Sequence, residues 1–316
     1  MNHCSLFTVH CSLFTLPAFA KINLSLRVLG KRPDGYHEIC TTLNTVSLCD
    51  YLTFEQADEI SLSCGAANSS VPTDQTNLVV RAANLLRERF STQQGAKIHL
   101  EKRIPSPGGL GGGSADAAVT LIALTHFWKI KTSGQSLIEI AETLGADVPF
   151  FLYGGTAFAT GAGTEIEILP NSPKKLLVIV TPNEMVSTAE AYRSLNAPSL
   201  TEVDSLSILT ICRSARIDSN SNRANLKNDF ENTIFSLKPE IERVRNKLLE
   251  FGASHALMSG SGASVFGIFD NERIREKACC SLRDTEADWR IFSCETVSQN
   301  EYKQALSPCW NLPKNL

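Results

Sequence analysis

A glycine-rich segment in the first half of the chain constrains the fold more than any other stretch. Five of the six residues from Gly108 to Gly113 are glycine, and an alanine-rich apolar run follows Ser114. Glycine lacks a Cβ and tolerates positive φ, so this segment cannot be the interior of a helix or strand, and its amides can turn toward one point. Ser114 is a typical N-cap residue, and the apolar spacing after it predicts a helix. The sequence therefore predicts a glycine loop that leads directly into a helix N-terminus.

A loop of this kind is a site for anions, because amide N–H groups and the positive end of the helix dipole face the same spot. A Walker A loop would require a lysine, but no Lys or Arg lies between Arg103 and Lys129, and the spacing of a Rossmann fingerprint is also absent. The alternative is a flexible linker, but linkers are seldom flanked by prolines such as Pro105 and Pro107 and by an alanine-rich helix. We therefore expect a polyphosphate held mainly by backbone amides.

Composition narrows the class of protein. The chain has 316 residues, of which 43% are hydrophobic and 20% charged, as in a globular protein large enough for two domains. A net charge of −3 supplies no basic field for nucleic acid, and no apolar run approaches the ~20 residues of a membrane span. None of the ten cysteines forms a C-x-x-C pair or a zinc-finger spacing, which favours reduced thiols. We expect a cytoplasmic monomer or weak homodimer without nucleic-acid or membrane partners.

The N-terminal residues need separate treatment. Ala18-Phe19-Ala20 looks like a signal-peptide cleavage triplet, but no Lys or Arg precedes Lys21, so the positive region of a secretory signal is missing. The same segment contains a direct repeat of six residues, 3–8 and 10–15. We interpret residues 1–16 as an N-terminal extension that is expected to be disordered, and we keep a signal peptide as the minor alternative.

Residues 18–29 alternate between polar and apolar side chains, which predicts a strand with one polar face. Lys21 and Asn23 point the same way on this face, about 7 Å apart, so a charge and an amide could converge on one ligand. In isolation, a solvent-facing strand is the more common explanation.

A turn follows this strand. In Pro33-Asp34-Gly35 the proline fixes φ and the glycine accepts positive φ, and the turn presents Tyr36 and His37 at its end. An aromatic face beside an imidazole suits a heteroaromatic base, which can stack and form hydrogen bonds. An ordinary hairpin turn is the alternative.

Asp147 stands between two predicted helical segments. Ser136 and Glu139 have the spacing of a capping box, Gly145 ends that helix, and Pro149 is typical of the first turn of the next one. Asp147 could therefore simply cap the second helix. A carboxylate near a phosphate site could equally accept a proton from a hydroxyl group.

Several of these segments together resemble the GHMP small-molecule kinases. They occur in that family's order, from about residue 17 to about residue 269: Lys21-Ile22-Asn23-Leu24, the loop 105–118, Gly145-Ala146-Asp147-Val148-Pro149-Phe150 and Ser259-Gly260-Ser261-Gly262. The segment Arg32-Pro33-Asp34-Gly35-Tyr36-His37 is similar to that of the branch that phosphorylates a cytidyl methylerythritol, a cytidine-bearing polyol of the non-mevalonate isoprenoid pathway. The resemblance implies an α+β fold with a mixed-sheet N-terminal domain (17–171), a ferredoxin-like C-terminal domain (172–316) and an active site between them.

The resemblance also implies residue roles. Lys21 and Asp147 match the family's catalytic pair, and Asn23 matches a contact on the hydroxyl side. Tyr36 and His37 fall where the family holds cytosine, with Tyr192 as a second stacking face. The residues that would hold ATP are Pro105, Gly108, Gly109, Leu110, Gly111, Gly112, Gly113 and Ser114.

The cofactor expected beside ATP is Mg²⁺, with Ser114 as its protein contact. Pro107 and Ala115 depart from residues common in the family, and both changes are expected to weaken ATP binding. Two other hypotheses remain open: another GHMP kinase, of homoserine or mevalonate type, and a non-catalytic nucleotide-binding protein of the same fold.

Overall fold

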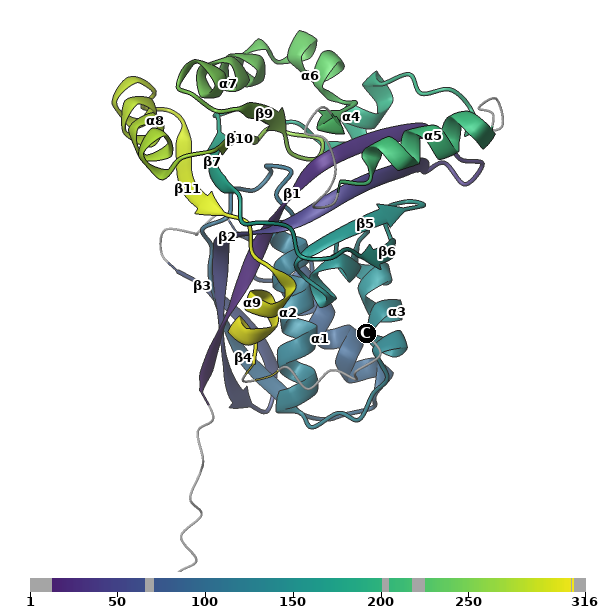
Figure 1. Ribbon diagram of the computed structural model, residues 1–316. Coiled ribbons are helices and arrows are strands. Elements are labelled where there is room, and N and C mark those ends of the chain that lie inside the picture. The colour runs from purple at the N-terminus through teal and green to yellow at the C-terminus, as the bar shows by residue number, and fades with distance from the viewer. Residues whose placement is uncertain (1–12, 66–70, 201–204, 218–224, 308, 310–316) are drawn as a thin grey trace, which may run out of the picture.

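The computed structural model describes residues 13–65, 71–200, 205–217, 225–307 and 309, which form two sheets and their covering helices (Figure 1). The strands are β1 (Phe14–Lys31), β2 (His37–Ala57), β3 (Ile60–Cys64), β4 (Gly95–Glu101), β5 (Thr156–Thr160), β6 (Glu165–Ile168), β7 (Leu176–Thr181), β8 (Lys227–Asn228), β9 (His255–Met258), β10 (Val265–Phe269) and β11 (Arg290–Glu295). The helices are α1 (Leu78–Arg89), α2 (Gly112–Phe127), α3 (Gly134–Leu144), the 3-10 helix η2 (Pro149–Leu152), α4 (Thr188–Ser194), α5 (Ser205–Ala215), α6 (Glu231–Leu237), α7 (Pro239–Glu250), α8 (Glu272–Thr285) and α9 (Gln299–Ala305).

The first sheet has seven strands in the order β3-β4-β2-β1-β8, and β5 joins β2 and β6. The long strands β1 and β2 pair antiparallel from one end to the other, with three shifts of register in β1. Helices α1, α2 and α3 lie together below this sheet in Figure 1. Apolar residues of the sheet and of these helices share one core, in which the alanine-rich face of α2 is fully buried.

The second sheet has the strand order β11-β7-β10-β9, and all of its pairs are antiparallel. Along the chain, β7 is followed by helices, then β9, β10, α8 and β11, which is the β-α-β-β-α-β succession of a ferredoxin-like fold. Helices α7 and α8 pack against these strands at the top of Figure 1. The expected α+β class with a mixed sheet and a ferredoxin-like unit is confirmed.

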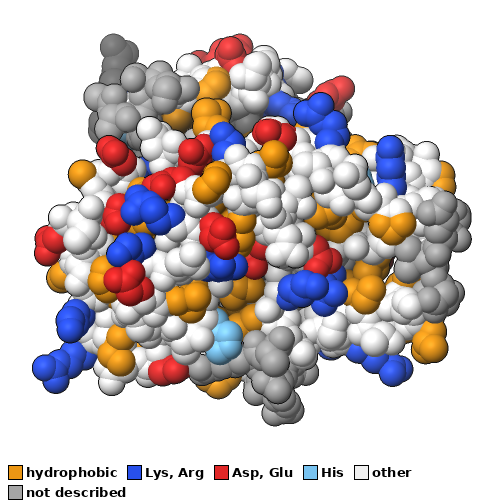
Figure 2. Space-filling model, turned by 90° about the horizontal axis from the view of Figure 1, so that it is seen from above, with side chains coloured by type: hydrophobic (Ala, Val, Ile, Leu, Met, Phe, Trp, Pro, Cys, Tyr) orange, Lys and Arg blue, Asp and Glu red, His pale blue; other side chains and the backbone are white. Residues whose placement is uncertain are grey.

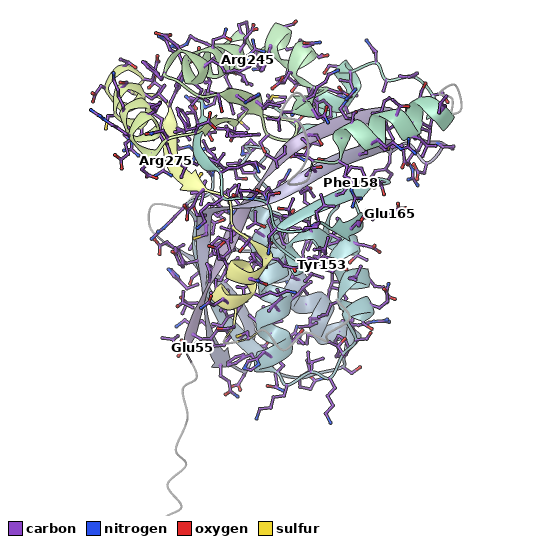
Figure 3. The ribbon with its side chains drawn as sticks, in the orientation of Figure 1. Glu55, Tyr153, Phe158, Glu165, Arg245 and Arg275 are labelled. Carbon is purple, nitrogen blue, oxygen red and sulfur yellow. The ribbon has the colours of Figure 1, made fainter. Side chains whose placement is uncertain are left out.

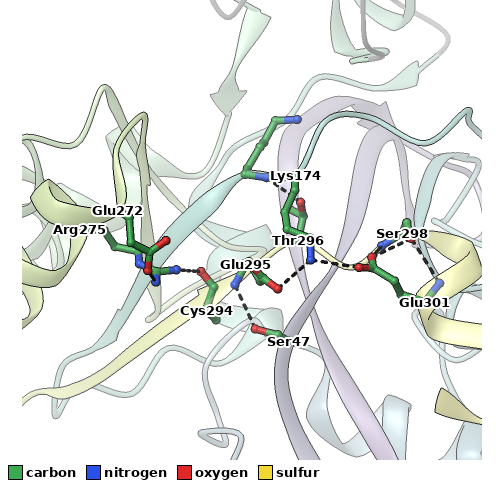
Figure 4. A network of polar contacts seen from close by, with 10 residues as sticks. Ser47, Lys174, Glu272, Arg275, Cys294, Glu295, Thr296, Ser298 and Glu301 are labelled. Carbon is green, nitrogen blue, oxygen red and sulfur yellow. Dashed lines mark hydrogen bonds and ion pairs between the residues drawn. The ribbon is translucent and has the colours of Figure 1, made fainter. Parts of the chain in front are cut away.

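The chain returns to the first sheet after β11. Figure 4 shows the polar contacts of this segment: the Glu295 amide donates to Ser47 Oγ at 3.0 Å, and Lys174 Nζ pairs with Glu295 at 2.8 Å and with Glu301 at 3.0 Å. Helix α9 then buries Tyr302 in the core of the first sheet. Residues from the end of the chain therefore complete this core, and the division at residue 171 stays a prediction.

The first strand begins earlier than the sequence pattern indicated. β1 starts at Phe14, whose ring stacks on Phe54 with 5.3 Å between centroids, and Leu16 is fully buried. Residues 14–16 of the expected extension thus belong to the fold, because their apolar side chains pack against β2. Residues 1–12, with most of the direct repeat, lie outside the described residues.

One other local prediction, the capping box at Ser136, is wrong. Helix α3 begins at Gly134, where Ser133 Oγ accepts from the Ser136 amide at 3.2 Å, so Ser136 is not the N-cap. The long strand β2 pairs with β1 on one side and with β5 and β4 on the other.

Helix α5 packs against β1 and β2 of the first sheet. Just beyond it, Arg216 pairs with Glu167 of β6 at 2.7 Å and lies over the ring of Phe158 on β5, which Figure 3 labels beside Glu165. These contacts dock the helix on the first sheet, and its apolar residues Ile208 and Ile211 pack beside Cys40.

The mixed surface charges and the free thiols both agree with what the composition predicted. On the face shown in Figure 2, basic and acidic side chains are interspersed. Elsewhere in the described structure, ion pairs include those of Arg243 with Glu240 and with Glu286. The eight cysteines within the described residues are all free thiols. No described helix combines the length and the apolar character needed to cross a bilayer.

Candidate active site

The glycine loop links β4 to α2, as predicted, but the helix begins earlier than predicted. Gly111 has a φ of +69° and forms the N-cap, and α2 starts at Gly112, so Ser114 is the third helical residue rather than the cap. Gly111 ends the loop in a left-handed conformation. A residue with a side chain would adopt this conformation only at a cost in free energy. No side chain caps this helix end, so the first amides of α2 remain open toward the loop.

A second glycine-rich turn, after β9, braces the loop. Ser259 Oγ donates to the Gly109 carbonyl at 3.0 Å, and the Ser264 amide donates to the Gly108 carbonyl at 3.2 Å. A Cβ on Gly109 would lie 2.1 Å from the Ser259 carbonyl oxygen, so only glycine permits this approach. The turn itself is held by Asn228, whose amide group donates at 2.8 Å to the carbonyls of Met258 and Gly260.

The predicted lysine and acid meet beside this loop. Lys21 Nζ lies 3.5 Å from Asp147 Oδ2, although β1 and the segment before η2 are far apart in sequence. The Lys21 side chain is 4% exposed, whereas that of Asp147 is 41% exposed. Asp147 does not cap η2, whose N-cap is Val148 with no capping side chain. The carboxylate is therefore free of a structural role at the helix and reachable by a ligand.

Lys21 and Asn23 share one face of β1, as the alternation indicated. Lys21 Nζ donates to Asn23 Oδ1 at 2.7 Å, and Asn23 Nδ2 donates to Thr41 Oγ1 at 2.8 Å. The Lys21 amide also donates to the Leu110 carbonyl at 2.9 Å, which ties β1 to the loop. These bonds fix the position of the buried ammonium.

The aromatic side chains form a second part of the site. The rings of His37 and Tyr192 stack with 4.7 Å between centroids, and Tyr192 meets Phe230 edge to face at 4.9 Å. Tyr36 is 67% exposed. Burial, and secondarily the charge of Lys31, lower the pKa of His37, which favours the neutral imidazole. Burial, with a smaller effect of Asp147, raises the pKa of Tyr192 to about 12.

All of the predicted site residues line one cavity of about 1020 Å³. It connects the glycine loop, the pair of Lys21 and Asp147, and the aromatic side chains. Basic residues on its wall favour an anionic ligand, and Asp147 is the one carboxylate among the described lining residues. This volume is at the upper end for small-molecule sites and leaves room for two ligands side by side.

Several other residues line the cavity without having been indicated as site residues by the sequence patterns, namely Lys31, Thr188, Arg193, Asn196 and Ser261. Ser261 belongs to the second glycine turn, a motif whose sequence alone does not show which of its residues faces a ligand. Arg193 directly follows Tyr192 on α4, so proximity in sequence was the available signal. Lys31 ends β1, Thr188 begins α4 and Asn196 follows α4, and no local pattern separates these three from surface residues.

The described residues contain no cluster of three or more His, Cys, Asp or Glu side chains that could hold a metal ion. Ser114 does line the cavity at the start of α2. Mg²⁺ in nucleotide sites commonly has one or two protein ligands, with phosphate oxygens and water completing the shell. A single hydroxyl beside a phosphate loop is compatible with that arrangement.

Comparison with known proteins identifies the class. The family models described as GHMP kinases N terminal domain and GHMP kinases C terminal match residues 77–155 and 213–287. Solved structures of a mevalonate kinase from Methanococcus jannaschii (15% identity) and a homoserine kinase from Cytophaga hutchinsonii (19% identity) share the fold, each with a TM-score of 0.65. They cover 92% and 91% of this chain, which spans 100% and 96% of theirs. The fold and the glycine loop thus define a GHMP kinase, an ATP-dependent small-molecule kinase.

Relatives of higher identity narrow the class. The 4-diphosphocytidyl-2-C-methyl-D-erythritol kinases of Chlorobium chlorochromatii and Pelotomaculum thermopropionicum are 41% and 43% identical over 85% and 86% of this chain, which covers 92% and 95% of theirs. A crystal structure of 4-(cytidine 5'-diphospho)-2C-methyl-D-erythritol kinase matches with a TM-score of 0.72 and 34% identity, covering 90% of this chain and 99% of its own. The chain belongs to the 4-diphosphocytidyl-2-C-methyl-D-erythritol kinase family.

Proposed function

We propose that the enzyme transfers the γ-phosphoryl group of ATP to the free 2-hydroxyl of 4-diphosphocytidyl-2-C-methyl-D-erythritol, a step of the non-mevalonate pathway to isoprenoid precursors. The names of the relatives support this substrate. The cavity supports it independently, because a phosphate loop at one end and aromatic side chains at the other suit a nucleotide donor and a cytidine-bearing acceptor.

The observation that carries the proposal is the position of Asp147 beside Lys21, between these two ends. Asp147 accepts the proton of the substrate hydroxyl as its oxygen attacks the γ-phosphorus. The new O–P bond forms while the bond to the bridging oxygen of ADP breaks, and ADP leaves with that electron pair. Lys21 places its ammonium group beside the carboxylate and stabilises negative charge on the transferring group.

ATP occupies the glycine loop in this proposal. The amides between Gly108 and Ser114 cradle its phosphates, and the N-terminus of α2 adds the favourable helix dipole. The Ser114 hydroxyl would be the protein contact of Mg²⁺, which when bound would supply positive charge against the ATP phosphates. Glycine at these positions lets the phosphates approach the backbone without steric conflict.

The acceptor occupies the aromatic end. We place the cytosine beside Tyr36 and His37, with Tyr192 completing the stacked surface, because a neutral imidazole and a ring face can bond and stack with a base. Asn23 lies next to Lys21, where its amide can contact the polyol near the reacting hydroxyl. The two ends together orient the hydroxyl toward the γ-phosphate, which is the main requirement of phosphoryl transfer.

A coupled assay of ADP release tests the proposal. The purified protein is given ATP and Mg²⁺ with the cytidyl methylerythritol, with homoserine or with mevalonate. ADP release with the cytidyl substrate alone is the expected result. Faster release with homoserine or mevalonate would assign another GHMP activity, and ATP binding without release on any acceptor would assign a non-catalytic protein.

A further inference from the structure

A buried charge network lies behind the glycine loop and outside the cavity. Lys102 Nζ contacts Asp50 of β2 and lies 2.9 Å from Asp116 Oδ2 on the first turns of α2. The three side chains are 10%, 0% and 3% exposed, respectively. None of them lines the cavity, so none is placed to touch substrate. Burial alone would lower the pKa of Lys102, but the two carboxylates outweigh burial and raise it, so the ammonium form is retained.

The network joins the two ends of the loop. On the side that precedes the loop, Asp50 Oδ1 accepts from the amides of Arg103 and Ile104, at 2.5 and 2.8 Å. On the side that follows the loop, Asp116 fixes the start of α2 through Lys102. One ammonium therefore connects the strand that leads into the loop with the helix that leads out of it.

The packing of Gly112 shows how close this connection is. A Cβ on Gly112 would lie 2.8 Å from Lys102 Nζ and 2.9 Å from Ile104 Cγ2. Gly112, the first residue of α2, is thus packed against Lys102 and against Ile104 at the start of the loop. The bonds from the second glycine turn hold Gly108 and Gly109 but do not reach this end of the loop.

We propose that Lys102, Asp50 and Asp116 are positioning residues that hold the loop amides in the geometry required for ATP phosphates. This inference rests on the proposed placement of ATP in the glycine loop. A loop of five glycines has many accessible conformations, so its ordering costs more entropy than that of other segments. A network that fixes both ends of the loop orders it during folding, so less conformational entropy is lost when ATP binds.

The test uses the full-length Asp116→Ala variant, which leaves Lys102 paired with Asp50. We expect kcat/KM for ATP to fall roughly 10- to 100-fold through a raised KM for ATP, with the KM for the alcohol substrate within about twofold of wild type. Hydrogen exchange at amides 108–113 of the ligand-free protein should accelerate on the order of tenfold. Asp116→Asn retains an oxygen acceptor for the ammonium and should recover part of both effects.

The matched control is Glu295→Ala, because Lys174 also contacts two carboxylates, Glu295 and Glu301, at a site remote from the loop. This pair is exposed and contributes little stability, so the variant should change neither the KM for ATP nor the exchange of the loop amides. The proposal would be overturned if Asp116→Ala folds and has the same KM for ATP and the same exchange rates as wild type. If Asp116→Ala does not fold, the same two measurements on Asp116→Asn decide the question. Absence of turnover in the wild type would refute the proposed function instead, while the hydrogen exchange would still decide the network.

Discussion

Lys21 Nζ and Asp147 Oδ2 lie 3.5 Å apart, but their side chains are in different environments. The lysine is buried on β1, whereas the acid faces the cavity. The ammonium is also held by Asn23 at 2.7 Å, so its position does not depend on the acid. A fixed cation therefore stands beside a carboxylate that solvent and substrate can reach. This asymmetry suits a pair in which the acid accepts a proton while the fixed ammonium group stabilises negative charge.

Replacing Asp147 tests this division of roles. Asp147→Asn should lower kcat by at least ~100-fold, because an amide cannot accept the hydroxyl proton, while the protein remains folded. The measurement is ADP release with the cytidyl substrate, with thermal unfolding as the check on folding. Asp284→Asn, a change at an exposed position of α8 outside the cavity, serves as a control for the chemistry of the substitution. Turnover near that of wild type in Asp147→Asn would refute the assigned base.

The exposed ring of Tyr36 gives a second prediction. Tyr36→Ala should raise the KM for the cytidyl substrate, since loss of one base-stacking contact costs about 1–3 kcal/mol, or roughly 5- to 150-fold. The KM for ATP should not change, because ATP is assigned to the other end of the cavity. Tyr36→Phe keeps the ring and should retain most of the affinity. An unaltered KM in Tyr36→Ala would remove this ring from the cytosine site.

The environment of His37 predicts a pH dependence. Burial and the charge of Lys31 lower the pKa of His37 below the ordinary value of 6.5. The fold thus favours neutral imidazole over imidazolium, so the contribution of this group to stability is present above pH 6.5 and is lost as pH falls through the lowered pKa. Titration followed by NMR should give a midpoint below 6.5, with His37→Gln to assign the signal. A midpoint at or above 6.5 would contradict the prediction.

Local patterns in the sequence were sufficient for some parts of this site. The run of glycines predicted the loop because glycine tolerates the positive φ that Gly109 and Gly111 adopt, and the alternation of residues 18–29 predicted that Lys21 and Asn23 share a face. Both follow from the geometry of neighbouring residues. The boundaries were less accurate, because the start of α2 depends on the conformation of Gly111 and the start of β1 on packing against β2.

Contacts between distant segments could not be derived from such patterns. The contact between Lys21 and Asp147 was expected only from the family resemblance. The sequences of a strand and of a distant helix end do not show that the two lie side by side. The brace from Ser259 to Gly109 and the network around Lys102 depend on the packing of two sheets and a helix. Their residues occur in the sequence as ordinary serines, lysines and aspartates, so only the fold shows that they act together.

The contact between Gly109 and the second glycine turn gives the last prediction, which concerns both stability and ATP binding. Gly109→Ala should destabilise the protein for two reasons: φ is +70°, which costs a residue with a Cβ about 1–2 kcal/mol, and the new methyl group would lie 2.1 Å from the Ser259 carbonyl oxygen. The loop must then move away from the second glycine turn, so the KM for ATP should rise as well. Gly35→Ala separates the two causes, because Gly35 has a φ of +88° and a methyl group there would have no atom within 4 Å. Urea unfolding should show a larger loss for Gly109→Ala than for Gly35→Ala, and equal losses would mean that the close contact with Ser259 adds nothing to the cost of the backbone conformation.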